Sequence, residues 1–247
     1  MANPVLSREW GEKETAESAP IAASPAAEPM ELGGTIGKAG ILLFIVVAFA
    51  AWGWTLVEPG AGWPPWLIVA LLGALIIGIA GVFLPKLAWL IGPVYSAAQG
   101  VVVGGISHVY NDAFSGIVLQ AILATATIFL VMLVLFATRT IRVTERTRGV
   151  IIGATIGIAL FYVGSILLAL IGVSIPLVWD TGVLGIGFSA LVIIVAAFNL
   201  MLDFDLIERG IAGGAPKYME WYAAWSLMIT IIWLYLEMLR LLGKVRS

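Results

Sequence analysis

The sequence predicts an all-α membrane protein that crosses the bilayer seven times. Of its 247 residues, 61% are hydrophobic and only 11% are charged, whereas soluble domains carry about 25% charged residues. The hydrophobic residues gather in seven runs, most of them near the roughly 20 residues that a helix needs to cross the hydrocarbon core. A transmembrane barrel would instead show short segments of alternating hydrophobicity. The sequence therefore predicts a bundle of membrane-spanning helices.

The predicted spans follow one another with short breaks that are polar or rich in Gly and Pro, such as EPGAGWPP. Tryptophans near span ends support these boundaries, because indole rings favour the membrane interface. Two Gly-x-x-x-Gly pairs, Gly100 with Gly104 and Gly153 with Gly157, have the spacing that lets helix backbones approach closely. The predicted spans are residues 40–57, 66–84, 87–110, 116–137, 150–173, 183–202 and 221–242.

Residues 1–37 are predicted to form a disordered tail ahead of a seven-helix domain of residues 38–247. The tail is rich in Ala, Pro, Ser and Glu and has no apolar period, so it cannot bury enough surface to offset the entropy of ordering. Its start, MANPVLSREWGEKET, lacks the basic and apolar regions of a secretory signal. We therefore expect a cytoplasmic tail, and we expect deletion of residues 1–34 to change stability little.

Basic residues predict the orientation of the chain. The loops EPGAGWPP, NDAFS and SIPLVWDTG contain no Lys or Arg, and by the positive-inside rule they face away from the cytoplasm. After seven crossings the C-terminus is then outside, which leaves Arg240, Lys244 and Arg246 on the less favoured side. A re-entrant last helix is the alternative. The basic residues on the side of the tail are Lys38, Lys86, Arg139, Arg142, Arg146, Arg148, Arg209 and Lys217.

The residue inventory excludes most catalytic chemistry. There is no cysteine, and His108 is the only histidine, so thiolate chemistry and zinc sites are excluded. The four lysines of residues 38–247 lie at span ends, which argues against a retinal Schiff base. We expect no enzymatic activity, no cofactor and no nucleic-acid partner.

Asp203 and Asp205, in NLMLDFDLIERG, are the main candidate site residues. Ionisable groups inside a span are costly to bury, usually face the protein interior and mark functional sites. The alternative is that both acids lie past the hydrocarbon edge and end the helix in water. This alternative suits Asp205, because Glu208 and Arg209 follow at once, whereas Asp203 lies deeper.

His108 and Asp112 form a second candidate pair. They are four residues apart, so a helix places them on one face. We expect an interfacial hydrogen bond, with a proton- or cation-sensing pair as the alternative.

Several stretches resemble the Bax inhibitor-1 family, in its bacterial YccA-like branch. They are GPVYSAAQGVVVGGIS (92–107), the run 116–157, NLMLDFDLIERG (199–210) and the run 215–242. The resemblance covers roughly residues 40–243. It implies a bacterial inner-membrane bundle in which six helices surround the last one. It also implies a pH-sensitive calcium leak, gated by one aspartate at the end of span six and one within span seven.

The resemblance places the span-six acid on Asp203. Its partner should fall within residues 226–230, where this chain has no acid, so Glu220 and Glu237 are the available substitutes. Gln99 stands where many members carry a glutamate in the third span.

From these residues we expect a calcium or cation leak through the bilayer. Asp203 would lie at its cytoplasmic mouth in transient contact with Ca²⁺, assisted by Asp205 and Glu220. The alternative is a non-conducting membrane protein that regulates a stress response or membrane proteolysis.

Overall fold

Seven long helices make up the computed structural model, which describes residues 28–60, 62–170 and 180–247. Each of the seven is long and apolar enough to cross a membrane. The predicted all-α fold with seven spans is therefore confirmed. The elements are α2 (Leu32–Thr55), α3 (Pro65–Phe83), the short 3-10 helix η1 (Pro85–Leu87), α4 (Ala88–Ala113), α5 (Ile117–Ala137), α6 (Glu145–Leu170), α8 (Val183–Ala212) and α9 (Met219–Arg246).

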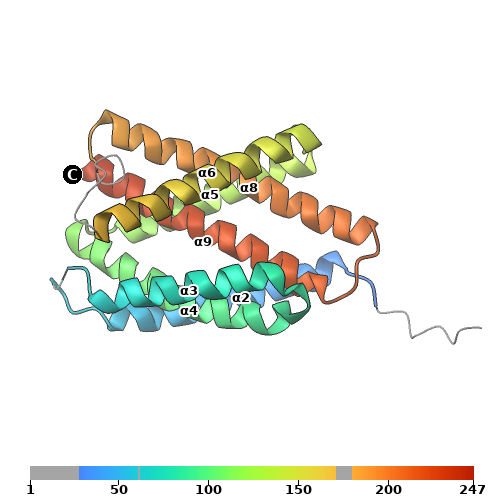
Figure 1. Ribbon diagram of the computed structural model, residues 1–247, viewed down its shortest axis with the longest axis horizontal. Coiled ribbons are helices and arrows are strands. Elements are labelled where there is room, and N and C mark those ends of the chain that lie inside the picture. Colours follow the sequence, from blue (N-terminus) through green and yellow to red (C-terminus); the bar gives the residue numbers. More distant parts are fainter. Residues whose placement is uncertain (1–27, 61, 171–179) are drawn as a thin grey trace, which may run out of the picture.

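Helix α9 occupies the centre of the bundle. Figure 1 shows it running diagonally between a group formed by α2, α3 and α4 and a group formed by α5, α6 and α8. It packs against α2, α4, α5 and α8, whereas α3 packs mainly on α4 and α6 on α8. The predicted central position of the last helix is confirmed. The 28 residues of α9 are continuous and span about 42 Å, so the last helix has the length of a full crossing rather than a re-entrant turn.

Glycines set the close packing of α2 on α4. A Cβ atom at Gly100 would lie 2.7 Å from the Val46 carbonyl oxygen, and one at Gly104 would overlap the Ala50 carbonyl oxygen. The predicted close approach at Gly100 and Gly104 is thus confirmed. The same prediction is wrong for the pair at residues 153 and 157 on α6, because no described atom lies within 4 Å of a Cβ built there.

The N-terminal end of the described chain packs against the connection between α8 and α9. The Met30 amide donates to the Ala215 carbonyl at 2.7 Å, and the Lys217 amide donates to the Glu28 carbonyl at 2.9 Å. Met30 is buried in a small cluster with Ile207. Residues 28–37 therefore belong to the helical domain and not to the predicted tail, whose first 27 residues lie outside the described part. A deletion through residue 34 removes these contacts, so we expect it to lower the stability of the fold.

An exposed ion pair between Glu28 and Lys217 joins the same two segments. The hydrogen bond from Lys217 and its charge lower the pKa of the Glu28 carboxyl. Because this pKa is lower in the folded chain than in the unfolded one, the pair stabilises the fold above the ordinary Glu pKa, and this contribution is lost as the pH falls through the lowered value. Both side chains are exposed, so the contribution is small.

Candidate functional site

Asp203 lies on the face of α8 that packs against α9. Its side chain is buried, with 6% of the residue exposed. The Ser226 hydroxyl of α9 donates to Asp203 Oδ1 at 2.6 Å, and Thr230, one turn further along α9, lies beside the same carboxyl. Oδ2 of Asp203 has no hydrogen-bond partner among the described residues. The site is thus a carboxyl group with hydroxyl neighbours and one free acceptor.

Asp203 also has no counter-charge in the part of the chain that the structure describes. Within the described ranges, the ion pairs formed by other acids leave Asp203 without a Lys, Arg or His partner. An isolated carboxylate is costly to bury. The arrangement therefore favours either a proton on Asp203 or a cation beside it.

The position expected for a second aspartate is filled by a hydroxyl. The resemblance placed that partner within residues 226–230, and Ser226 indeed contacts Asp203. A serine hydroxyl donates a hydrogen bond but cannot share an acidic proton as a second carboxyl does. At this contact, α8 and α9 therefore bring together one carboxyl group where the two-aspartate arrangement has two.

Asp205 is held by two arginines, one on α6 and one on its own helix. Arg148 of α6 forms an ion pair with it, and Arg209 Nε donates to Oδ1 at 3.0 Å. Arg209 also reaches Glu145 Oε1 at 3.0 Å. The expectation that Asp205 simply ends a helix in water is wrong, because α8 continues to Ala212 and Asp205 is only 7% exposed. This network joins the end of α8 to the start of α6.

Glu220 is fully buried where α9 meets α2. Its carboxylate pairs with Lys38 and accepts a hydrogen bond of 2.9 Å from the Glu31 amide. Gly34 leaves room for this contact, because a Cβ there would overlap the Glu220 carboxylate. Glu220 is therefore engaged with α2 and does not act as the partner of Asp203 in this structure.

Glu237 lies near the other end of α9, about 16 Å along the helix from Ser226. The Tyr162 hydroxyl donates to Glu237 Oε1 at 3.0 Å, and Arg240 donates to the same oxygen at 2.6 Å. Arg240 also donates to the Tyr162 oxygen at 2.6 Å. The structure thus does not bring Glu237 to Asp203 either; it places it in a separate buried cluster between α6 and α9.

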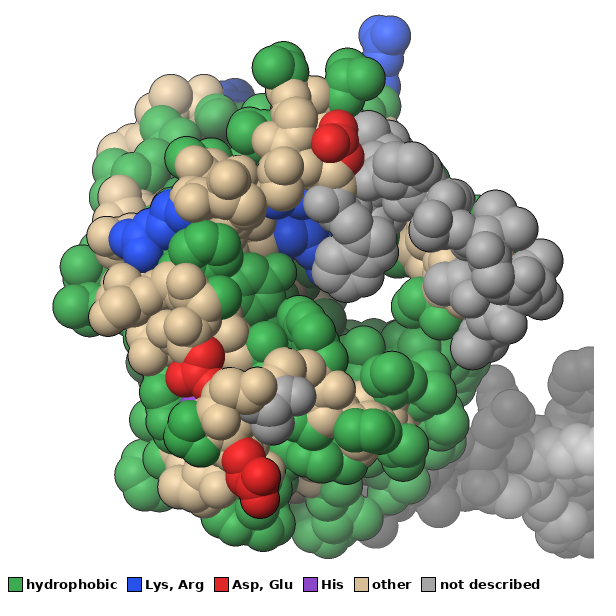
Figure 2. Space-filling view, turned by 90° about the vertical axis from the view of Figure 1, so that its left-hand side faces the viewer, with side chains coloured by type: hydrophobic (Ala, Val, Ile, Leu, Met, Phe, Trp, Pro, Cys, Tyr) green, Lys and Arg blue, Asp and Glu red, His purple; other side chains and the backbone are tan. Residues whose placement is uncertain are grey.

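The basic residues that conflicted with the orientation rule are bound to protein groups. Besides the Arg240 contacts, Lys244 Nζ donates to the Gly185 carbonyl at 3.0 Å. Arg246 donates to the Ser115 carbonyl at 3.1 Å and to Gln120 Oε1 at 2.6 Å. Figure 2 shows this end of the bundle, where a few charged side chains lie among hydrophobic ones. These cations stabilise the end of α9, so they are weak indicators of orientation.

Gln99 is buried on α4. Its Nε2 donates to the Tyr95 hydroxyl at 3.2 Å, and its Oε1 has no partner among the described residues. Tyr95 in turn packs edge-to-face on Trp225 of α9. Gln99 therefore lies in the α4 layer beside α9, and no hydrogen bond joins it to Asp203.

His108 and Asp112 share one face of α4, as predicted. His108 Nδ1 lies 2.7 Å from the Trp54 carbonyl oxygen, and since a carbonyl only accepts, Nδ1 carries the proton. His108 Nε2 lies 3.4 Å from Asp112 Oδ1, and the Gly60 amide donates to Asp112 at 3.0 Å. These contacts join α2, the following loop and α4, and the expected hydrogen bond between His108 and Asp112 stays a prediction. A sensing role stays a prediction.

Three of these partners were not predicted from the sequence: Arg148, Tyr162 and Ser226. Arg148 and Tyr162 are separated from their acids by 57 and 75 positions, beyond the reach of any helical period. An acid in one span can pair with an arginine or tyrosine in another span, but the sequence shows such a pair only when the packing of the helices is known.

The described residues contain no group of three or more His, Cys, Asp or Glu that could hold a metal ion. Any Ca²⁺ contact would thus rest on Asp203 and neutral oxygens.

Comparison with known proteins gives a family. A sequence model described as Bax inhibitor 1 like matches residues 3–247. The match includes most of the tail that the resemblance, which began near residue 40, left out. No curated protein and no solved structure matches the chain. Because the family match extends over nearly the whole sequence, this chain belongs to the Bax inhibitor 1 like family.

Proposed function

We propose that this protein is a cation leak pathway of a bacterial inner membrane, with calcium as the expected ion and Asp203 as the group that binds the ion or a proton. One observation carries this function: a carboxyl group buried within a span that has, among the described residues, no counter-charge and one oxygen without a partner. Ca²⁺ prefers carboxylate and neutral oxygen ligands, which Asp203, Ser226 and Thr230 supply. Family membership supports the same function.

The role is limited to Asp203. Asp205 and Glu220, expected to assist at the mouth, are neutralised by arginines and by Lys38, so we assign both to holding helices together. We assign no catalytic step and no cofactor. With a single carboxyl group, protonation proceeds in one step and removes the only acidic ligand. Acidification is therefore expected to reduce conduction.

Calcium flux in proteoliposomes tests this function. Asp203→Asn keeps the side-chain size and removes the charge. We expect it to lower flux about tenfold at neutral pH, equivalent to about 1.4 kcal/mol of lost cation binding, and to abolish the pH dependence. Glu208→Gln is the matched control, because this acid lies in an exposed pair with Arg139, and its flux should follow the wild type. A folded Asp203→Asn protein with wild-type flux at every pH would contradict the role of Asp203.

One observation favours a non-conducting protein as the second candidate. A cavity of about 850 Å³ lies between α2 and α5, but it is apolar and Asp203 does not line it. In this alternative the protein regulates other membrane proteins in a stress response or in proteolysis. Wild-type liposomes without ion flux at any pH would support it and exclude the leak.

Cysteine labelling tests the proposed orientation, with the N-terminus in the cytoplasm and the C-terminus outside. The chain has no native cysteine, so Thr147→Cys and Ser247→Cys can be labelled without background. We expect an impermeant maleimide to label residue 247 in intact cells and residue 147 only after permeabilisation. Labelling at 147 with protection at 247 would reverse the orientation, and protection at both would contradict an outside C-terminus.

A further inference from the structure

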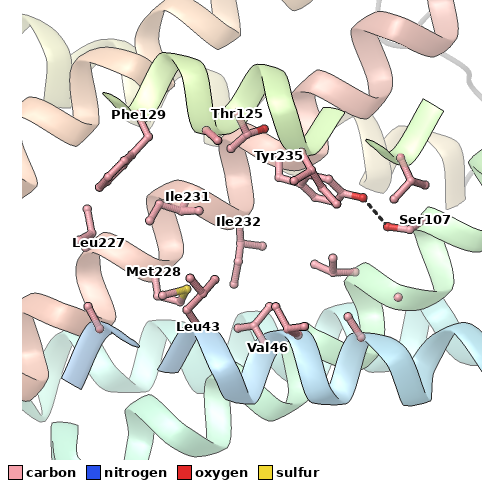
Figure 3. A pocket seen from close by; sticks show the side chains of 18 of the residues that line it. Leu43, Val46, Ser107, Thr125, Phe129, Leu227, Met228, Ile231, Ile232 and Tyr235 are labelled. Atoms are coloured by element: carbon pink, nitrogen blue, oxygen red, sulfur yellow. Dashed lines mark hydrogen bonds between the residues drawn. The ribbon is translucent and has the colours of Figure 1, made fainter. Parts of the chain in front are cut away.

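An apolar crevice runs along the bundle between α2 and α5. Its volume is about 850 Å³, and α9 forms its back wall (Figure 3). Leu43 and Val46 of α2, Phe129 of α5, and Met228 and Ile232 of α9 are among the side chains that line it. None of the charged residues discussed above contributes to this lining.

The crevice opens sideways, toward the lipid. Helices α2 and α5 each pack on α9 but scarcely touch each other. Residues at its rim are exposed, with Leu43 at 46% and Ile122 at 49%, whereas Met228 at the back is only 1% exposed. All of these residues lie within predicted membrane spans, so the opening faces hydrocarbon. An unfilled gap there would forfeit the dispersion contacts of its lining.

The length of the crevice suits a hydrocarbon chain. Its lining on α2 runs from Ile36 to Trp54, which is about 27 Å of helix and close to the thickness of the hydrocarbon core, about 30 Å. Bilayer lipid surrounds the spans, so an acyl chain reaches this opening without any partner protein.

Three hydroxyl groups line the crevice, from Ser107, Thr125 and Tyr235. The Ser107 and Tyr235 hydroxyls bond to each other at 2.7 Å, and the Thr125 hydroxyl is buried without a partner among the described residues. Gln120, five residues before Thr125 and thus about 7.5 Å away along α5, accepts a hydrogen bond from Arg246. Within the described ranges Arg246 pairs with no carboxylate. A lipid phosphate would pair with the Arg246 guanidinium, and a lipid ester carbonyl would accept a hydrogen bond from the Thr125 hydroxyl.

We propose that the crevice binds a phospholipid of the bilayer, with one acyl chain against α9, an ester carbonyl near Thr125 and the phosphate near Arg246. The chain replaces the missing contact between α2 and α5 and covers the apolar face of α9. Arg246 supplies the charge that distinguishes a phospholipid from a neutral lipid, since a guanidinium suits phosphate.

A photoreactive phospholipid in nanodiscs tests this site. A diazirine on the acyl chain should form adducts on residues 227–235 of α9, which lie behind α2 and α5, as well as on the exposed face of α6. Gly40 lines the crevice and has no atom within 4 Å of a built Cβ, so Gly40→Phe can fill it. We expect Gly40→Phe to reduce the α9 adducts about tenfold and to leave the α6 adducts unchanged. Gly153→Phe, an equally open position on α6, is the matched control and should change neither.

Two further measurements distinguish a bound phospholipid from a bound lipid without phosphate. Arg246→Gln should lower the α9 adducts several-fold with the phospholipid probe, and a photoreactive fatty acid without phosphate should label α9 poorly in the wild type. Adducts on α6 with none on α9 would overturn the site. Wild-type labelling in Arg246→Gln, or equal labelling by the fatty acid, would overturn the phospholipid assignment. If Gly40→Phe instead dissociated an oligomer, the crevice would be a contact between copies and the inference would be wrong.

Discussion

Glu220→Gln is expected to lower the free energy of unfolding by about 3 kcal/mol, because it leaves the Lys38 ammonium beside a buried site without its counter-charge. Breaking a buried ion pair by removing one partner costs about 3–5 kcal/mol. The lower end applies because Lys38 retains 17% exposure of its side chain and can turn toward water. For a chain of this length, that loss corresponds to a fall in Tm of roughly 6–12 °C. Thermal unfolding in detergent measures it.

Two controls isolate the buried pair. Glu208→Gln removes the acid of an exposed pair with Arg139, and exposed pairs contribute at most about 1 kcal/mol, so its Tm should change little. Lys38→Met combined with Glu220→Gln removes both charges, and the double variant should be more stable than Glu220→Gln alone. A Glu220→Gln protein with wild-type Tm but altered ion flux would contradict the structural role. Glu220 would then take part in ion conduction, as the sequence analysis expected.

The sequence predicted the helices because hydrophobicity and length suffice to identify a membrane span. Where the boundaries were wrong, paired polar residues caused the error. Span six was predicted to end at residue 202, since charged residues follow, yet α8 continues to Ala212. Arg148 and Arg209 neutralise Asp205 inside the protein, and hydropathy cannot distinguish such pairing from exposure to water.

The start of α2 was missed for a similar reason. Residues 28–37 contain Pro29 and three glycines, which suggests a linker. In the structure the Glu220 carboxylate occupies the space that a side chain at Gly34 would fill, and Met30 is buried. The first depends on α9 and the second on Ile207 of α8 as well, so no local pattern could predict them.

Asp203 could be selected from sequence because an acid directly after an apolar run is conspicuous without knowledge of its partners. The residues that surround Asp203 could not be predicted from the sequence. The facing position on α9 was narrowed to residues 226–230, and packing then selected Ser226. The contrast with Asp205, two residues away, shows why: successive residues on a helix face different neighbours, and only the positions of α6 and α9 decide which acid meets an arginine.

Gly104→Val should destabilise the fold by about 3 kcal/mol or more, because α2 and α4 touch through their backbones at this residue. A Cβ there would overlap the Ala50 carbonyl oxygen and crowd its Cα, and backbone atoms cannot turn aside as a flexible side chain can. Overpacking in tight interiors costs about 1–3 kcal/mol and occasionally more. Thermal unfolding measures the loss, and Gly153→Val supplies the control, since it places the same side chain at an open position on α6.

The outcome distinguishes two origins of stability in this bundle. If close approach of α2 and α4 is essential, Gly104→Val lowers Tm far more than Gly153→Val, and the shift of α2 also disturbs the crevice that Gly104 lines. Adducts of the photoreactive phospholipid on α9 should then change in Gly104→Val but not in Gly153→Val. Equal Tm values for the two variants would mean that α2 moves away without cost. The burial of Glu220 against Lys38 would then anchor α2, and its glycine contacts with α4 would contribute little.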